Sequence, residues 1–116
     1  MNLHATAATL HKYLISTLLC LSLRVAAEPI WIDVRSPAEY LQGHLDGAIN
    51  IPYHEVAVRI ASITPNHAAE INVYCAVGVR AQIAKVQLES TGYKNVRNRG
   101  GYADLRAQRA AMRVAH

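Results

Sequence analysis

The chain has 116 residues, which is enough for one domain with a single hydrophobic core. Apolar residues make up 52% of it and charged residues 17%, a balance that argues against wholesale disorder. The net charge of +4 is mild and the basic residues are scattered without interleaved aromatic residues, so we do not expect a nucleic-acid-binding protein.

The first 27 residues have the pattern of a secretory signal peptide. An uncharged apolar run covers residues 13–23, and the small residues that end at Ala27 precede Glu28. The run is shorter than the roughly 20 residues that a membrane-spanning helix needs. We expect cleavage after Ala27, a mature domain of residues 28–116 in the periplasm and no stable membrane association afterwards. The alternatives are a buried core helix and an uncleaved anchor.

The mature chain alternates short β-rich runs with helical patterns. Ser36, Pro37 and Glu39 form a capping pattern that opens the first helix, and Gly43 ends it. The expected strands are at 30–34, within 47–52, at 71–74 and at 95–97. The other expected helices, which alternate with these strands, are at 55–62, 79–90 and about 102–110. This alternation predicts a small single α/β domain with a mostly parallel sheet flanked by helices.

Cleavage after Ala27 would remove Cys20 and leave Cys75 as the only cysteine, so the domain could not form an internal disulfide. Cys75 follows an apolar strand and precedes a glycine-containing turn and a helix. Backbone N–H groups and the positive helix end at such a place stabilise a thiolate. A reactive thiol is therefore one interpretation, and an inert buried cysteine is the other.

Two further residues of this turn have expected roles. Gly78 permits a backbone conformation or a close approach that a Cβ would forbid, unless it is simply a flexible turn. Arg80 is the cation nearest to Cys75 in the sequence. It either faces an anionic substrate or holds the loop by pairing with a carboxylate inside the domain.

A set of landmarks occurs in a characteristic order. They are Asp33-Val34-Arg35, Glu39-Tyr40, residues 43–52, Val73-Tyr74-Cys75 with Gly78 and Arg80, Gly92-Tyr93 and Gly100-Gly101. Over about Trp31 to Leu105, the chain resembles the rhodanese family of sulfurtransferases. With its signal-like N-terminus and single small domain, it is most similar to the periplasmic phage-shock rhodaneses of bacteria.

This resemblance implies a thiosulfate-type sulfurtransferase. Cys75 would take a sulfur atom from thiosulfate as a persulfide and pass it to cyanide or a thiol, without a cofactor or metal. The implied site is Cys75 with the substrate-binding residues Ala76, Val77, Gly78, Val79 and Arg80, and with Asp33 and Arg35 as an ion-paired support beneath the loop. We expect the protein to be a monomer. Direct substrate contact by Arg35 is the less favoured alternative.

Alternatives to this function remain open. The six-residue loop from Cys75 to Arg80 is one residue shorter than that of phosphatases with the same fold, which makes phosphatase chemistry the weaker enzymatic interpretation. Ala76, Val77 and Val79 are apolar where other rhodaneses often carry basic residues, which leaves room for a protein-borne sulfur donor. A persulfide carrier and a non-catalytic binding or sensor module are therefore the other hypotheses, although the presence of Cys75 favours the enzyme.

Overall fold

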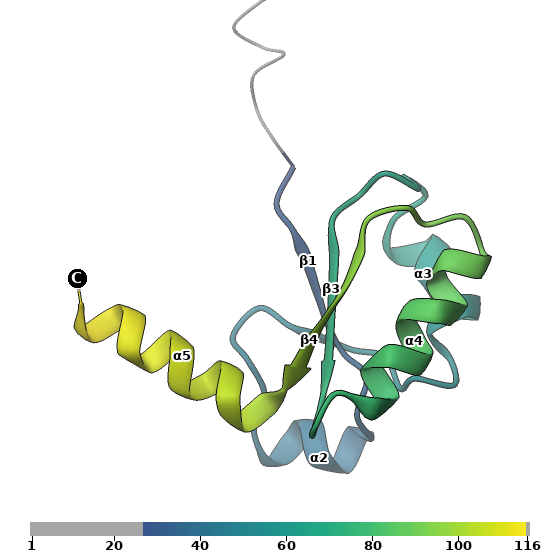
Figure 1. Cartoon of the computed structure of the whole chain (residues 1–116). Helices are drawn as coiled ribbons and strands as arrows, with labels where there is room; N and C mark the ends of the chain where they lie inside the picture. Colours follow the sequence, from purple (N-terminus) through teal and green to yellow (C-terminus); the bar gives the residue numbers. More distant parts are fainter. Residues whose placement is uncertain (1–26, 116) are drawn as a thin grey trace, which may run out of the picture.

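Residues 27–115 are described by a computed structural model, so most of the expected signal segment lies outside the described residues. Four parallel strands form one sheet in the order β2-β1-β3-β4 (Figure 1). The elements are β1 (Ile30–Asp33), α2 (Pro37–Gln42), β2 (Ile49–Asn50), α3 (Val56–Ile63), β3 (Ile71–Cys75), α4 (Val79–Ser90), β4 (Val96–Gly101) and α5 (Tyr102–Val114). The predicted α/β class with a parallel sheet is confirmed. Within the described residues, no helix has both the length and the apolar character needed to cross a membrane.

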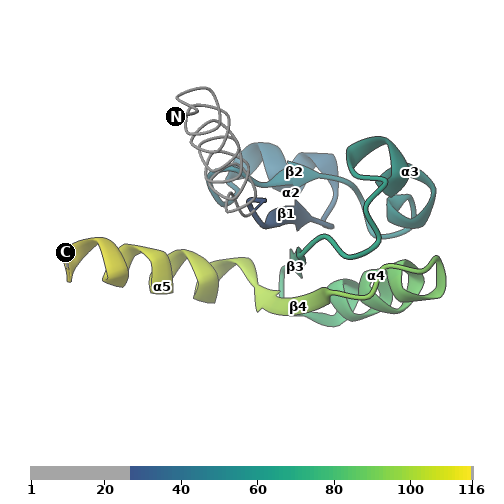
Figure 2. The same cartoon turned by 90° about the horizontal axis from the view of Figure 1, so that it is seen from above.

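Helices cover the two faces of the sheet unequally. The larger core joins β1 and β3 to the buried sides of α3 and α4, whereas a smaller cluster contains Leu45, Ala48, Tyr74 and Leu105. Figure 2 shows α4 and α5 extending to opposite sides of β4. All five residues of β3 are buried, as expected for a central parallel strand that has cores on both faces.

The helix that precedes β2 begins as its sequence predicts. The backbone N–H of Glu39 donates to Ser36 Oγ at 3.2 Å, and the backbone N–H of Ser36 donates to Glu39 Oε1 at 3.2 Å, which confirms the capping box. Gly43 ends this helix with a φ of 149°. The prediction for α4 is also confirmed, since it runs from Val79 to Ser90.

The last two elements are longer than predicted. Strand β4 continues to Gly101 because Gly101 pairs with Cys75 of β3, after a register shift between Val73 and Cys75. Helix α5 continues to Val114 instead of Ala110, because its second half is rich in alanine, arginine and methionine, which favour helix. Gly100 and Gly101 therefore form the end of strand β4.

Gly101 lies directly against the loop that follows β3. A Cβ at this position would stand 2.5 Å from the carbonyl oxygen of Ala76, a distance that no packed Cβ tolerates. The φ of Gly101 is −106°, which any residue adopts. The need for glycine here therefore comes from close packing and not from backbone conformation.

We expect Gly101→Ala to destabilise the fold by about 1–3 kcal/mol, because the added methyl group displaces the backbone of the loop. Urea unfolding measures this loss. Gly100→Ala is the control: its Cβ meets nothing within 4 Å, so it reports only the cost of a positive φ. An unchanged unfolding midpoint for Gly101→Ala would contradict the close packing.

Candidate active site

The sulfur of Cys75 lies at the carboxyl end of the central strand β3. Cys75 is 1% exposed, and the backbone N–H of Gly78 donates to its Sγ at 2.9 Å. Helix α4 begins at the next residue, so the positive end of its dipole is at the same place. The loop therefore encloses one sulfur atom and offers it a hydrogen-bond donor, which is an arrangement suited to a sulfur anion.

Gly78 and Asn98 hold the turn of this loop closed. Gly78 has a φ of 97°, in the left-handed region that favours glycine, and a Cβ there would stand 3.4 Å from the Cα of Gly100. The side-chain amide of Asn98 donates to the carbonyl oxygen of Gly78 at 3.0 Å, while its Oδ1 accepts from the backbone N–H of Gly100 at 2.9 Å. The sequence assigned no role to Asn98, whose only signal was its place two residues before the first glycine of the Gly100-Gly101 pair.

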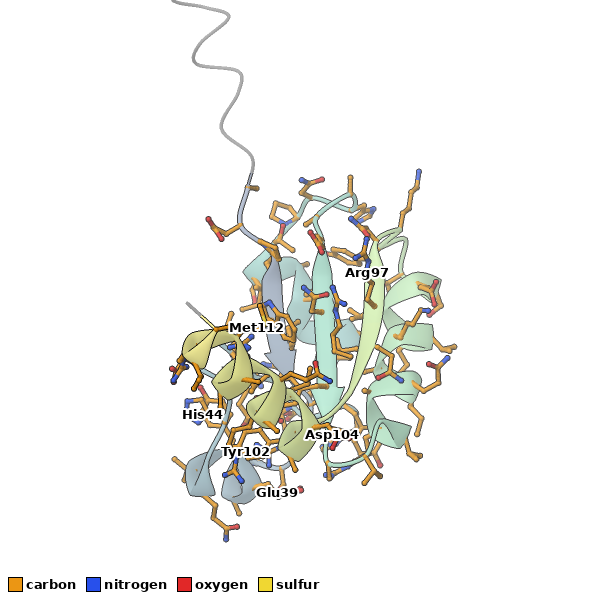
Figure 3. The ribbon with its side chains drawn as sticks, turned by 60° about the vertical axis from the view of Figure 1, so that its left-hand side comes forward. Glu39, His44, Arg97, Tyr102, Asp104 and Met112 are labelled. Carbon is orange, nitrogen blue, oxygen red and sulfur yellow. The ribbon has the colours of Figure 1, made fainter. Side chains whose placement is uncertain are left out.

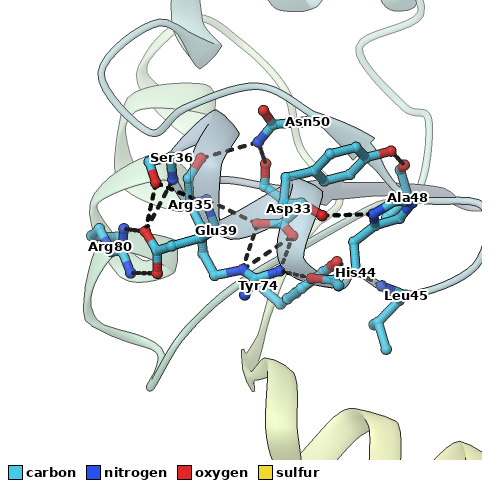
Figure 4. A network of polar contacts seen from close by, with 12 residues as sticks. Asp33, Arg35, Ser36, Glu39, His44, Leu45, Ala48, Asn50, Tyr74 and Arg80 are labelled. Carbon is cyan, nitrogen blue, oxygen red and sulfur yellow. Dashed lines mark hydrogen bonds and ion pairs between the residues drawn. The ribbon is translucent and has the colours of Figure 1, made fainter.

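Arg80, at the end of the loop, is paired with Glu39. Its two terminal nitrogens donate to the two carboxylate oxygens of Glu39 at 2.7 and 3.0 Å, which joins the beginning of α4 to the beginning of α2 (Figure 4). The hydrogen bonds from Arg80 lower the pKa of Glu39 to about 2, so this carboxylate stays ionised at neutral pH. The geometry favours the interpretation that Arg80 holds the loop. Its partner is the carboxylate of Glu39, for which the sequence indicated only a role in capping the helix.

The guanidinium of Arg80 is also electrostatically coupled to the site. Its pKa is raised, chiefly by the hydrogen bonds to Glu39 and in smaller part by the charge of Cys75. The positive charge of Arg80 is thus close enough to interact with an anion formed at the sulfur.

Asp33 and Arg35 form a buried ion pair. Arg35 Nη2 donates to Asp33 Oδ2 at 2.7 Å, and Arg35 Nε donates to Oδ1 at 3.0 Å. The same Nη2 donates to the carbonyl oxygen of Gly43 at 2.7 Å, and the guanidinium carbon lies 4.4 Å from the centre of the Tyr102 ring. The hydrogen bond to Asp33 raises the pKa of Arg35. These contacts enclose the guanidinium and indicate a structural role.

The position of this pair differs from the expected one beneath the loop. Asp33 is paired in register with Tyr74, whose ring lies in the smaller cluster, whereas Cys75 belongs to the larger core on the other face. Arg35 therefore supports the loop indirectly. It holds Gly43 at the end of α2, and Glu39 of the same helix holds Arg80.

The outer side of the loop is apolar. Val77 is 79% exposed and Val79 is 65% exposed, and Ala76 between Cys75 and Val77 is exposed as well. Of the predicted site residues, the structure thus brings the Cys75–Arg80 loop together around one sulfur and places Asp33 and Arg35 on the opposite face. The loop can bind and release a sulfur-centred anion next to a water-exposed apolar surface.

The side chain of His44, which follows α2, is engaged with Tyr40. His44 stacks on the ring of Tyr40 at 3.6 Å, and its Nδ1 donates to the Tyr40 carbonyl oxygen at 2.9 Å. Within residues 27–115, no group of three or more histidine, cysteine, aspartate or glutamate side chains is placed to hold a metal ion.

Comparisons with known proteins agree with this geometry. The family model described as a rhodanese-like domain matches residues 20–108. The thiosulfate sulfurtransferase PspE of Escherichia coli (strain K12) is 45% identical over 94 residues, which cover 81% of this chain and 90% of that protein. The thiosulfate:glutathione sulfurtransferase of Saccharomyces cerevisiae is 34% identical over 77 residues, covering 57% of this chain and 55% of that protein.

Solved structures give the same result. A rhodanese with anions from E. coli superposes with a TM-score of 0.64 at 45% identity, covering 66% of this chain and 91% of that chain. The human single-domain sulfurtransferase superposes with a TM-score of 0.57 at 26% identity, covering 76% of this chain and 84% of that chain. The fold is thus shared along most of the domain, and the chain belongs to the rhodanese-like family.

Proposed function

We propose that this protein is a thiosulfate sulfurtransferase that carries the transferred sulfur as a persulfide on Cys75. The observation that carries this proposal is the hydrogen bond from the Gly78 N–H to Cys75 Sγ inside a closed six-residue loop. The similarity to PspE, a thiosulfate sulfurtransferase by name, supports the same donor.

The reaction proceeds in two exchanges at one sulfur atom. The Cys75 thiolate attacks the outer sulfur of thiosulfate, the bond between the two thiosulfate sulfurs breaks, and sulfite leaves with the electron pair. An acceptor, cyanide or a thiolate, then attacks the outer sulfur of the persulfide and returns Cys75 as a thiolate. The Gly78 N–H and the beginning of α4 stabilise the negative charge at both stages.

The first test is the intact mass of the protein before and after thiosulfate. We expect a gain of one sulfur atom that is lost on adding cyanide, because the persulfide is a covalent intermediate. Cys75→Ser should show no gain while it keeps the fold. A folded wild-type protein with a free thiol and no mass gain would contradict thiosulfate as the donor.

A second test separates the two roles of Arg80. If Arg80 acts by holding the loop, Glu39→Gln and Arg80→Gln should each lower kcat by on the order of tenfold, since a slightly misplaced site loses that much or more. The double variant should then be no slower than either single variant, because all three lack the same ion pair. A KM for thiosulfate that rises in Arg80→Gln alone would instead assign Arg80 to substrate binding.

The proposed place of action is the periplasm, with the mature protein free of the membrane. This rests on the signal pattern of residues 1–27, which lies almost wholly outside the described residues. In a Gram-negative host, we expect a periplasmic extract to contain protein that begins at Glu28, as measured by N-terminal sequencing. Intact protein that begins at Met1 and sediments with membranes would contradict export and cleavage.

A further inference from the structure

A groove leads away from the catalytic loop along α4 and the edge strand β4. It is a shallow groove, widely open to solvent, with a volume of about 1090 Å³, and Gly78 and Gly100 line the end that adjoins the loop. Gly78 is also the residue whose N–H contacts Cys75 Sγ, so this end of the groove adjoins the loop that encloses the sulfur, although buried Cys75 does not itself line the groove. Strand β4 is the last strand of the sheet, so one side of its backbone faces the groove.

The wall beside the loop, at the beginning of α4, carries exposed apolar side chains. Val77 and Val79 are joined along this wall by Ile83, which is 41% exposed. Val79 and Ile83 are four residues apart and so share one side of the helix, while Ala84 and Leu88 on the other side fill the core. The exposed apolar stripe is therefore separate from the part of α4 that stabilises the fold.

The far end of the groove is positively charged. Lys85, Arg97 and Arg99 line it, and Figure 3 shows Arg97 beside β4. Arg97 and Arg99 lie 3.7 and 3.9 Å from the same carboxylate oxygen of Glu70, so one negative charge is shared by two cations. Lys85 takes part in none of the ion pairs found within residues 27–115. Arg99 also donates to Asn72 Oδ1 at 2.7 Å, so Lys85 and Arg97 are the cations of this end that remain most available to a ligand.

The spacing along the groove between the loop and the cationic residues sets the size of the occupant. Helix α4 rises about 1.5 Å per residue, so Lys85 is about 9 Å further along the helix than Val79. Strand β4 advances about 3.3 Å per residue, so Arg97 is about 10 Å back from Gly100. An extended peptide also advances about 3.3 Å per residue, so it spans this distance about three residues from its cysteine.

We propose that the groove binds an extended, acidic segment of a partner protein, and that a cysteine of this segment accepts the sulfur from Cys75. This rests on the proposed sulfurtransferase activity. Acidic side chains would meet Lys85 and Arg97, apolar ones would cover Ile83, and the free edge of β4 offers backbone hydrogen bonds to an added strand.

The transfer needs no further reactant. The partner's thiolate attacks the outer sulfur of the Cys75 persulfide, the bond between the two persulfide sulfurs breaks, and Cys75 leaves as a thiolate. The partner's cysteine then carries the persulfide.

The test measures sulfur transfer from the loaded protein to peptides with one central cysteine. The acidic peptide has aspartate and glutamate three and four residues from the cysteine on both sides. The neutral control peptide has asparagine and glutamine at the same positions. Each kcat/KM is divided by the rate of discharge to cyanide for the same variant. We expect about a tenfold preference for the acidic peptide at low salt, since opposite charges favour association.

Charge reversal locates this preference. The double variant Lys85→Glu/Arg97→Glu should abolish it, and the matched double variant Arg59→Glu/Arg106→Glu, with the same change of net charge outside the groove, should keep it. Equal ratios for the two peptides, or a preference that survives Lys85→Glu/Arg97→Glu, would overturn the proposal. Glutathione is the small-thiol control, because its carboxylates lie next to its cysteine. If Lys85→Glu/Arg97→Glu lowers the kcat/KM for glutathione as much as the kcat/KM for the acidic peptide, the groove serves small thiols and the proposal of a protein partner is overturned.

Failure of the underlying reaction is visible separately. A protein that is not loaded by thiosulfate gives no discharge to cyanide, which contradicts the proposed function itself. The groove is then tested by fluorescence anisotropy of a labelled acidic peptide with serine in place of cysteine. Saturable binding that is lost in Lys85→Glu/Arg97→Glu supports the docking surface, and absence of binding overturns it.

Discussion

The site depends on one constraint: a loop of six residues has to close around a single sulfur atom at the end of β3. The Gly78 N–H reaches Cys75 Sγ only because Gly78 adopts a positive φ. That turn is held from outside by Asn98 of β4, and the end of the loop is held by the pairing of Arg80 with Glu39. A buried thiol without these restraints would be an inert core residue, whereas here its negative form has a fixed hydrogen-bond donor.

Contacts on both faces of the sheet support this loop. On the face of the larger core, α4 packs through Ala81, Ala84 and Leu88, which sets the direction of its first turn. On the other face, the buried pair of Asp33 and Arg35 holds the end of α2 through the Gly43 carbonyl. Burying such a pair is costly unless its hydrogen bonds are satisfied, and here they are, so α2 presents Glu39 to Arg80 from a fixed position.

The distribution of charge around the sulfur has consequences for substrate choice. The rim carries Val77 and Val79 and no basic side chain, while Arg80 is occupied by Glu39. The accessible cations of the groove are instead set back along α4 and β4. Backbone donors therefore stabilise the small sulfur anion at the loop, and the side-chain cations are available to a longer, negatively charged molecule.

Local sequence patterns determined much of this protein. The capping pattern of Ser36 and Glu39, the alternation of strands and helices, the full length of α4 and the place of Cys75 depend on neighbouring residues, and they were predicted. Only the tertiary structure decided that Glu39 pairs with Arg80, 41 residues away, and that Gly101 pairs with Cys75 and lies against Ala76. Those contacts join segments that are distant in the chain, and their geometry follows from how the strands align and how the helices pack, which no local pattern specifies.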